Sequence, residues 1–269
     1  QKTFQPGYQG RTYSRIHSHV TSFQEPMVQH PTRIFLLSHM RAYSSLIGHI
    51  LGSHPEIDGY YEMHISYQNN RDLIKQETVY SQQESFKSGS HFLFDKLLHN
   101  KYKLNLQQLE LKQPRILVTL RSPEKTIKSI IHLFQKKEQQ RLYANPQEAT
   151  KYYIQRLQQL SEFCQINSQL YYYFDAELIR SNSTAMLATL TQWLQLESPL
   201  NDQYQLFSKT GKSGAGDSSK SIQRGKIVTS TNSYSNIEIS DELLESAEQA
   251  YRKFRSIMIE QSIEERSVN

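Results

Sequence analysis

Two short segments of this chain combine arginine and serine at spacings suited to binding an anion. The first reads Arg41-Ala42-Tyr43-Ser44-Ser45 and follows the apolar run 34–37. The second reads Arg121-Ser122-Pro123, and Ser129 lies seven residues after Ser122, on the same face of a helix. A guanidinium presents a planar fork of donors to phosphate or sulfate, and serine hydroxyls can donate to the same oxygens. The sequence therefore predicts two phosphate or sulfate positions.

Both segments lie where a strand is expected to pass into a helix. We expect strands at 33–37, 57–61, 91–95, 115–120 and 170–174, and helices at 44–52, 123–138, 146–166, 183–195 and 241–262. This alternation predicts an α/β fold, a single domain with a central parallel β-sheet flanked by helices. The domain is expected at 32–269, after an irregular N-terminal arm at 1–31.

In such a sheet, ligands bind at the carboxyl ends of the strands, where helix N-termini present free N–H groups. Ser122 is a good N-cap and Pro123 suits the first helical position, so a capped helix with a surface arginine is the bland interpretation of the second segment. Two strand–arginine–serine–helix units in one chain instead suggest a ligand with two separated phosphates.

The loop expected at 208–236 contains two incomplete nucleotide motifs. Gly211-Lys212-Ser213 resembles the end of a triphosphate-binding loop, but Leu206 stands where that motif needs its first glycine. Gly214-Ala215-Gly216 lacks the third glycine of a dinucleotide fingerprint, because Ser219 occupies that place. A nucleotide-dependent kinase is therefore disfavoured, although the loop could still hold an anion.

Composition limits the remaining possibilities. The 269 residues carry a formal charge of +5, which suits a polyanionic ligand, but no dense Lys/Arg cluster interleaved with aromatics indicates nucleic-acid binding. The lone Cys164 rules out internal disulfides and cysteine-based metal sites, and no His/Asp/Glu cluster has metal-ligand spacing. No apolar run approaches the roughly 18–20 residues of a transmembrane segment. With a single cysteine, a reducing cytoplasm is the simplest interpretation, and we expect a cytoplasmic protein.

These segments, in this order, resemble the sulfotransferases that use 3'-phosphoadenosine-5'-phosphosulfate (PAPS). That family reads R-S-G-[ST]-[ST]-L after its first strand, at the 5'-phosphosulfate, and this chain has Arg41 to Leu46 there. A second family segment, R-x-P with a serine several residues later, binds the 3'-phosphate and matches Arg121, Pro123 and Ser129. The resemblance implies a P-loop-like sulfotransferase fold.

Further matches extend this resemblance over about residues 33–230. The stretch "GSHPEIDGYYEMH" resembles one that ends in a catalytic glutamate in the tyrosylprotein and bacterial branches, which places Glu62 at that position. Asp95-Lys96 resembles the family's D-K segment, although Leu98 replaces its proline. The loop "GAGDSSKSIQRGKI" resembles the family's C-terminal loop near the 3'-phosphate, so Lys212 and Gly216 are expected at the nucleotide.

The resemblance assigns roles to these residues. Arg41 would neutralise charge on the bridging oxygen, and the loop from Ala42 to Ser45 would hold the 5'-phosphate through Ser44, Ser45 and backbone amides. Arg121 and Ser129 would hold the 3'-phosphate. Glu62 would take the acceptor proton; His64 is the alternative base, because it shares Glu62's side if the strand continues. No metal is required.

The acceptor is a hydroxylated molecule of unknown kind: a small molecule, a sugar or a lipid. Its pocket is expected in the loops 63–90 and 136–150, where the residues from Gln68 to Arg71 form a polar wall. One alternative stays open, a non-catalytic nucleotide-binding protein with the same fold. Tyr43 supports it, because the family has glycine there and a tyrosine at positive φ costs about 1–2 kcal/mol.

Overall fold

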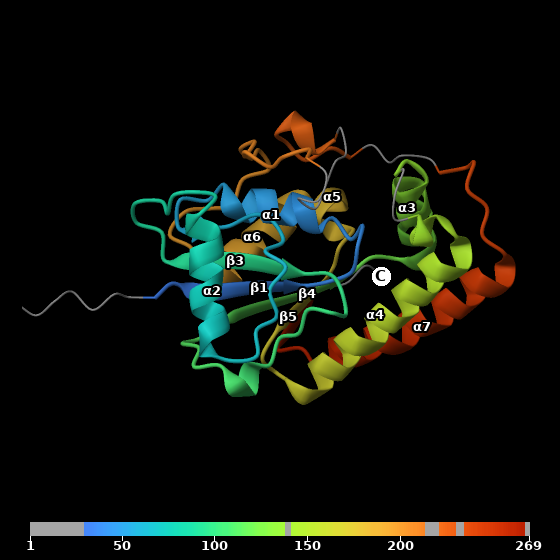
Figure 1. The fold of residues 1–269 in the computed structure, drawn as a ribbon, viewed down its shortest axis with the longest axis horizontal. Helices are drawn as coiled ribbons and strands as arrows, with labels where there is room; N and C mark the ends of the chain where they lie inside the picture. Colours follow the sequence, from blue (N-terminus) through green and yellow to red (C-terminus); the bar gives the residue numbers. More distant parts are fainter. Residues whose placement is uncertain (1–29, 138–140, 213–220, 230–233, 267–269) are drawn as a thin grey trace, which may run out of the picture. The chain divides into compact units, whose positions relative to one another are not determined.

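A computed structural model of the chain describes residues 30–137, 141–212, 221–229 and 234–266. Within these residues six strands form one sheet in the order β2-β3-β1-β4-β5-β6, and every pair of neighbours is parallel (Figure 1). The strands are β1 (Thr32–Leu37), β2 (Ile57–Asp58), β3 (Phe92–Leu97), β4 (Arg115–Leu120), β5 (Tyr172–Asp175) and β6 (Glu264–Arg266). The predicted parallel α/β sheet is confirmed. The arm predicted at 1–31 lies outside the described residues except for its last two.

The helices are α1 (Ser44–Gly52), α2 (Asn70–Ser81), α3 (Pro123–Gln135), α4 (Pro146–Ile166), α5 (Leu178–Ser181), α6 (Ser183–Leu194) and α7 (Asp241–Glu260). Two of the predicted ranges, 44–52 and 146–166, match their helices at both ends. The treatment of 63–90 as a loop was wrong, because α2 occupies its middle. Asn69 and Asp72 form a capping box at the start of α2, a signal already present in the sequence.

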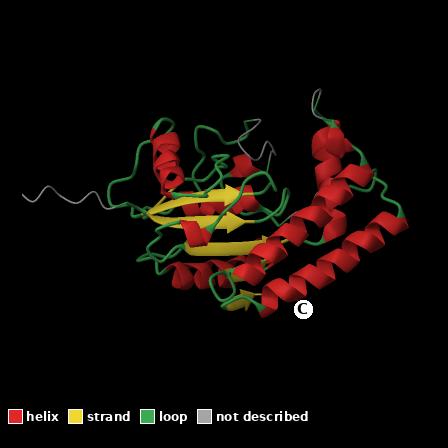
Figure 2. Cartoon of the chain, turned by 60° about the horizontal axis from the view of Figure 1, so that its bottom comes forward, coloured by secondary structure: helices red, strands yellow, loops and turns green. Residues whose placement is uncertain are grey.

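Helices lie on both sides of the sheet (Figure 2). Alternate strand residues accordingly face two separate hydrophobic layers. Ile34 and Leu36 of β1 face the layer that α1 and α6 cover. Phe35 and Leu37 face the layer built with α3, α4 and α7. Each fully buried side chain of this kind contributes about 1.5–3 kcal/mol, so the two layers fix which side chains of β1 face each side of the sheet.

The order of the strands creates one point where ligands are expected to bind. β1 lies between β3 and β4, and the chain passes from β3 on one side of β1 to β4 on the other. In open α/β sheets this reversal leaves a crevice at the carboxyl ends of the strands. The loops after β1 and β4 carry the two predicted arginine–serine segments, so both segments lie at this crevice.

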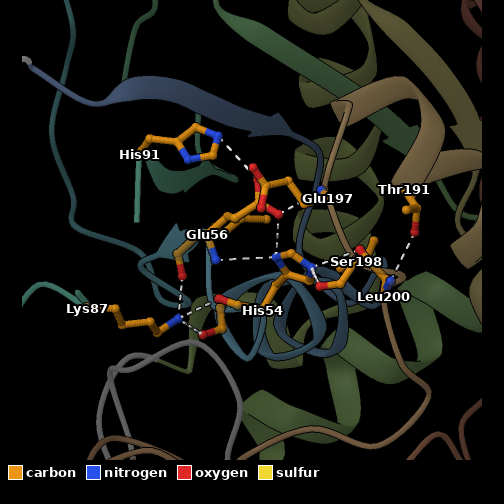
Figure 3. A network of polar contacts seen from close by, with 10 residues as sticks. His54, Glu56, Lys87, His91, Thr191, Glu197, Ser198 and Leu200 are labelled. Atoms are coloured by element: carbon orange, nitrogen blue, oxygen red, sulfur yellow. Dashed lines mark hydrogen bonds and ion pairs between the residues drawn. The ribbon is translucent and has the colours of Figure 1, made fainter. Parts of the chain in front are cut away.

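A polar network fixes the far end of α1 (Figure 3). Lys87 Nζ donates to the carbonyls of Gly52, His54 and Ile57, just after the last turn of the helix. A cation suits the unsatisfied carbonyls at a helix C-terminus. Glu56 accepts from the backbone N–H of Glu197 at 2.8 Å. With its C-terminus held in this way, α1 directs its N-terminus at the crevice.

Candidate functional site

The loop between β1 and α1 has a strained backbone at two positions. Arg41 has φ 67° and Tyr43 has φ 57°, both in the left-handed region. The positive φ expected at Tyr43, where the resembling family has glycine, is therefore confirmed. A residue in this region followed by helical residues turns successive N–H groups to one side, a geometry that binds anions. Ser44 and Ser45 follow at once and are 5% and 6% exposed.

Lys96 connects this loop to the end of β3. Its side chain is 2% exposed, and Nζ donates to Ser45 Oγ at 2.9 Å. Lys96 belongs to the Asp95-Lys96 pair that resembles the family's D-K segment, and the structure joins its ammonium to the loop serine Ser45. A buried ammonium at this point adds positive charge where the first phosphate is expected.

The second segment has the predicted architecture, with one difference. Ser122 precedes Pro123 at the start of α3, but its hydroxyl donates to Glu177 Oε1 at 2.8 Å and does not cap the helix. Arg121 is 6% exposed, and Nη1 donates to the Arg41 carbonyl at 2.9 Å. Its Nε is buried and has no hydrogen-bond partner in the described part of the chain. Such an orphan donor is costly unless a ligand satisfies it.

Arg41 joins the two segments. Its Nε donates to Ser129 Oγ at 2.9 Å, and the same hydroxyl lies 3.0 Å from the Tyr234 hydroxyl. The resemblance placed Arg41 at the 5'-phosphosulfate and Ser129 at the 3'-phosphate, yet here the two side chains are in direct contact. Burial lowers the pKa of the Arg121 guanidinium beside them. Arg41, Arg121 and Ser129 together form what we call the arginine cluster.

Helix α4 holds the loops that carry the cluster. The Tyr152 hydroxyl donates to the Leu98 carbonyl and accepts from Met40 N–H, both at 2.8 Å. The Tyr153 hydroxyl donates to the Arg121 carbonyl at 2.7 Å. Arg156 donates to the carbonyls of Ser38 and Leu97 at 2.8 and 2.6 Å. One helix thus holds four backbone carbonyls at the ends of three strands, and it also holds the Met40 N–H. The carbonyls are those of Ser38, Leu97, Leu98 and Arg121.

A buried histidine bridges the two loops directly. His39 is fully buried, and its Nε2 accepts from the backbone N–H of Arg121 at 3.0 Å. Its Nδ1 lies 2.9 Å from the Met40 carbonyl, to which only a protonated nitrogen can donate. Burial lowers the pKa of His39 to about 3, and this pair of contacts fits the neutral ring with its proton on Nδ1.

Glu62 lies on an irregular segment held against β3. Met63 N–H donates to Asp95 Oδ1 at 3.0 Å, which fixes the backbone beside Glu62. The Glu62 residue is 8% exposed, and its Oε1 has no hydrogen-bond partner within the described residues. Oε1 lies 4.0 Å from His99 Nε2. Glu62 thus presents a buried acceptor with unused capacity, as a general base requires.

His64 does not lie as the sequence suggested. The strand predicted at 57–61 ends at Asp58, so the alternation that was to place His64 beside Glu62 does not continue. His64 has φ 58° and is exposed, and its ring packs near Tyr102 at 5.4 Å between centroids. The premise for His64 as a neighbour of Glu62 was wrong.

The C-terminal loop is anchored over α1. Phe207 stacks on Tyr60 at 4.1 Å between ring centroids, and Thr210 Oγ1 lies 2.9 Å from His49 Nε2. Lys212, at the end of this anchored stretch, is exposed. Gly216 lies outside the described residues.

Three of the residues expected to form a polar wall of the acceptor pocket line a hollow in the structure. Asn69, Asn70 and Arg71 line a shallow hollow with Gln108, and Asn70 Oδ1 accepts from Glu110 N–H at 2.8 Å. These residues therefore associate with the segment after β3 and belong to the start of α2. Of the other expected acceptor loop, 136–150, the described part holds the short 3-10 helix Leu142–Ala144 and the first turn of α4.

No group of three or more His, Cys, Asp or Glu side chains in the described ranges could hold a metal ion. Among the helices that the structure describes, none is long and apolar enough to cross a membrane.

Comparisons with known proteins give the fold a precedent. No protein-family model matches the sequence, and no curated protein matches it. The structure is similar to a sulfotransferase domain from the curacin biosynthetic pathway, with TM-score 0.58 and 17% identity over 84% of this chain and 98% of that one. It is also similar to a sulfotransferase domain from the Synechococcus PCC 7002 olefin synthase, with TM-score 0.54 and 15% identity over 86% and 98%. Mouse sulfotransferase SULT7A1 complexed with PAP matches with TM-score 0.48 and 13% identity over 85% and 84%. The chain has the α/β fold of sulfotransferase domains, as the motifs predicted.

Proposed function

We propose that this protein is a sulfotransferase that moves a sulfuryl group from PAPS to a hydroxyl or amine of an acceptor. The observation that carries the proposal is the arginine cluster at the crevice of the sheet, where Arg121 keeps a buried Nε donor without a partner among the described residues. The fold shared with sulfotransferase domains supports the same reaction class.

The residues present fit both ends of such a nucleotide. Ser44, Ser45 and the N–H groups at the start of α1 suit the 5'-phosphate, with the Lys96 ammonium behind Ser45. The Arg121 fork and Ser129 suit the 3'-phosphate. The two groups come from neighbouring strands, β1 and β4, so one nucleotide can span them.

Bound PAPS would supply a sulfuryl group already activated by its anhydride bond to phosphate. Transfer breaks the S–O bond to the 5'-phosphate and forms an S–O bond to an acceptor hydroxyl, or an S–N bond to an acceptor amine. Lys96 and Arg41 would stabilise the negative charge that grows on the leaving phosphate. Glu62 would accept the acceptor's proton on its buried Oε1, a contribution of about 10²–10⁴ in rate for a positioned base.

We assign the acceptor only as a hydroxylated small molecule, sugar or lipid, and we place the reaction in the cytoplasm because the lone cysteine is a buried free thiol. A second candidate function is nucleotide binding without catalysis. Tyr43 favours it, because a strained tyrosine stands in the loop that would hold the donor.

Calorimetric titration tests the proposal. The protein is titrated with 3'-phosphoadenosine-5'-phosphate (PAP) and with 5'-AMP, which lacks the 3'-phosphate. Arg121→Ala should weaken PAP binding by about 1.5–3 kcal/mol, the range for a charge-assisted hydrogen bond, and should leave AMP binding nearly unchanged. Arg115→Ala is the matched control, because Arg115 lies at the opposite end of the same strand.

A wild type that binds neither nucleotide would refute the proposal. Release of PAP from PAPS in the presence of an acceptor panel then separates the two candidate functions. Tight binding of PAP without turnover of PAPS across the panel would favour the non-catalytic function.

A further inference from the structure

The ring of Tyr43 lies against two arginines, which follow two different strands of the sheet. The Arg121 guanidinium carbon is 4.5 Å from the ring centroid, and that of Arg180 is 5.1 Å away. Arg180 Nη1 also lies 3.4 Å from the Tyr43 hydroxyl, to which it donates. Arg180 belongs to α5, directly after β5, whereas Arg121 follows β4.

A guanidinium uses its face and its edge for different partners. Its flat face packs on an aromatic ring, and its edge donates to oxygen acceptors. Contact with a ring therefore restricts the rotation of a long side chain, whereas a phosphate is bound through the edge. Arranging the fork before the ligand arrives reduces the entropy that binding costs.

Both arginines are also fixed through part of their edge. Arg180 Nε donates to the Val228 carbonyl at 2.6 Å, and Arg121 Nη1 donates to the Arg41 carbonyl at 2.9 Å. One ring thus contacts two guanidiniums of like charge. The backbone of Tyr43 is held at φ 57°, where a side chain is disfavoured, so the site retains a ring at a conformational cost.

We propose that Arg180 is a further cation of the 3'-phosphate site, and that the Tyr43 ring is a positioning residue that orients Arg121 and Arg180 toward that phosphate. The proposal rests on the proposed function and adds to it a specificity determinant. A terminal phosphate monoester carries up to two negative charges, and two positioned forks match it better than they match a singly charged group.

The first test measures Arg180 directly. Arg180→Ala should weaken PAP binding about tenfold and change 5'-AMP binding less than twofold, both measured by calorimetry on the full chain. Arg115→Ala is the matched control, because Arg115 also faces an aromatic ring, Trp193, at 5.9 Å but lies at the other end of the sheet. Equal losses for PAP and AMP, or no loss for PAP, would overturn the assignment of Arg180.

The second test separates the ring from the backbone strain. Tyr43→Phe keeps the aromatic face and should bind PAP within about twofold of wild type. Tyr43→Leu keeps a bulky side chain at the same φ but removes the aromatic face, and should weaken PAP binding about fivefold. Tighter or unchanged binding in Tyr43→Leu would show that the ring blocks the arginines or plays no part in positioning them.

A third measurement keeps this inference apart from the proposed function. Inorganic pyrophosphate serves as a probe of the phosphate-binding groups without the nucleoside, and it should raise the unfolding temperature of the wild type more than that of Arg180→Ala. If the wild type binds no PAP, the proposed function fails. The pyrophosphate shift then decides on Arg180 independently, and a shift equal in both proteins would overturn its role.

Discussion

The neutral His39 makes the folding stability of this protein depend on pH in a predictable direction. Its pKa is lowered from 6.5 to about 3 by burial, so the unfolded chain takes up this proton at a higher pH than the folded protein does. The stabilising contribution is therefore complete above pH 6.5 and is lost as the pH falls from 6.5 toward 3. Between pH 7.5 and pH 5 the loss should be about 2 kcal/mol, at 1.36 kcal/mol per pH unit.

Urea unfolding at pH 7.5 and pH 5 measures this effect, with His39→Gln as the variant. Glutamine can still accept from Arg121 N–H but carries no titrating group, and every other ionisable group is common to both proteins. The wild type should be the more stable protein at pH 7.5. Its free energy of unfolding should exceed that of His39→Gln by about 2 kcal/mol less at pH 5 than at pH 7.5. His64→Gln, at an exposed histidine, is the matched control and should behave as the wild type does.

A difference in the free energy of unfolding between the wild type and His39→Gln that does not change with pH would refute this reasoning. It would mean that the folded protein accommodates a protonated His39, and the hydrogen bond from Arg121 N–H to Nε2 could not then be the contact that joins the two loops.

Three further predictions concern the site. Arg41→Ala should lower sulfuryl transfer by about two to three orders of magnitude, as loss of a charge-stabilising donor does, and normal turnover in this variant would remove Arg41 from the mechanism. Glu62→Gln should lower the rate constant by about 10²–10⁴ with PAP affinity unchanged by calorimetry, whereas His64→Gln should change the rate little; the reverse ranking would make His64 the base. Tyr43→Gly should be more stable to urea than Tyr43→Ala by roughly 0.5–1 kcal/mol, because only glycine is unstrained at φ 57°, and an alanine variant of equal or greater stability would show that the loop carries no strain there.

The sequence predicted the elements around the phosphate segments well because several local signals agree there. At the second segment an apolar strand, a serine in the N-cap position and a proline at the first helical position together predict where α3 begins. At α2 the periodic pattern of apolar residues that predicts a helix is weak. The buried residues of this helix are Gln76 and Tyr80, and the rest of it is largely polar. Only its capping box, which rests on Asn69 and Asp72, distinguished the helix from a loop.

The arrangement of the site was predicted in part. Arg121 and Ser129 were predicted to converge from their places on one strand end and one helix face, and in the structure each of them contacts Arg41. The direction of the Arg41 side chain did not, because it depends on a left-handed backbone at a non-glycine residue. The contacts of Tyr152, Tyr153 and Arg156 with the loops join residues far apart in the sequence, and spacing alone cannot reveal them. His64 was misplaced because its position was inferred from a strand that ends four residues before Glu62.

Helix α4 gives the site a mechanical property that no single contact has. The loops after β1, β3 and β4 all attach to one stretch of this helix, through Tyr152, Tyr153 and Arg156. Both ends of a nucleotide held by these loops would therefore depend on the position of one helix, because the loops after β1 and β4 both contact α4. Glu62 is tied to this arrangement less directly, because Met63 N–H donates to Asp95 of β3, and α4 contacts the Leu97 and Leu98 carbonyls at the end of that strand. A displacement of α4 would thus act on the nucleotide loops and on the strand that anchors the base at the same time.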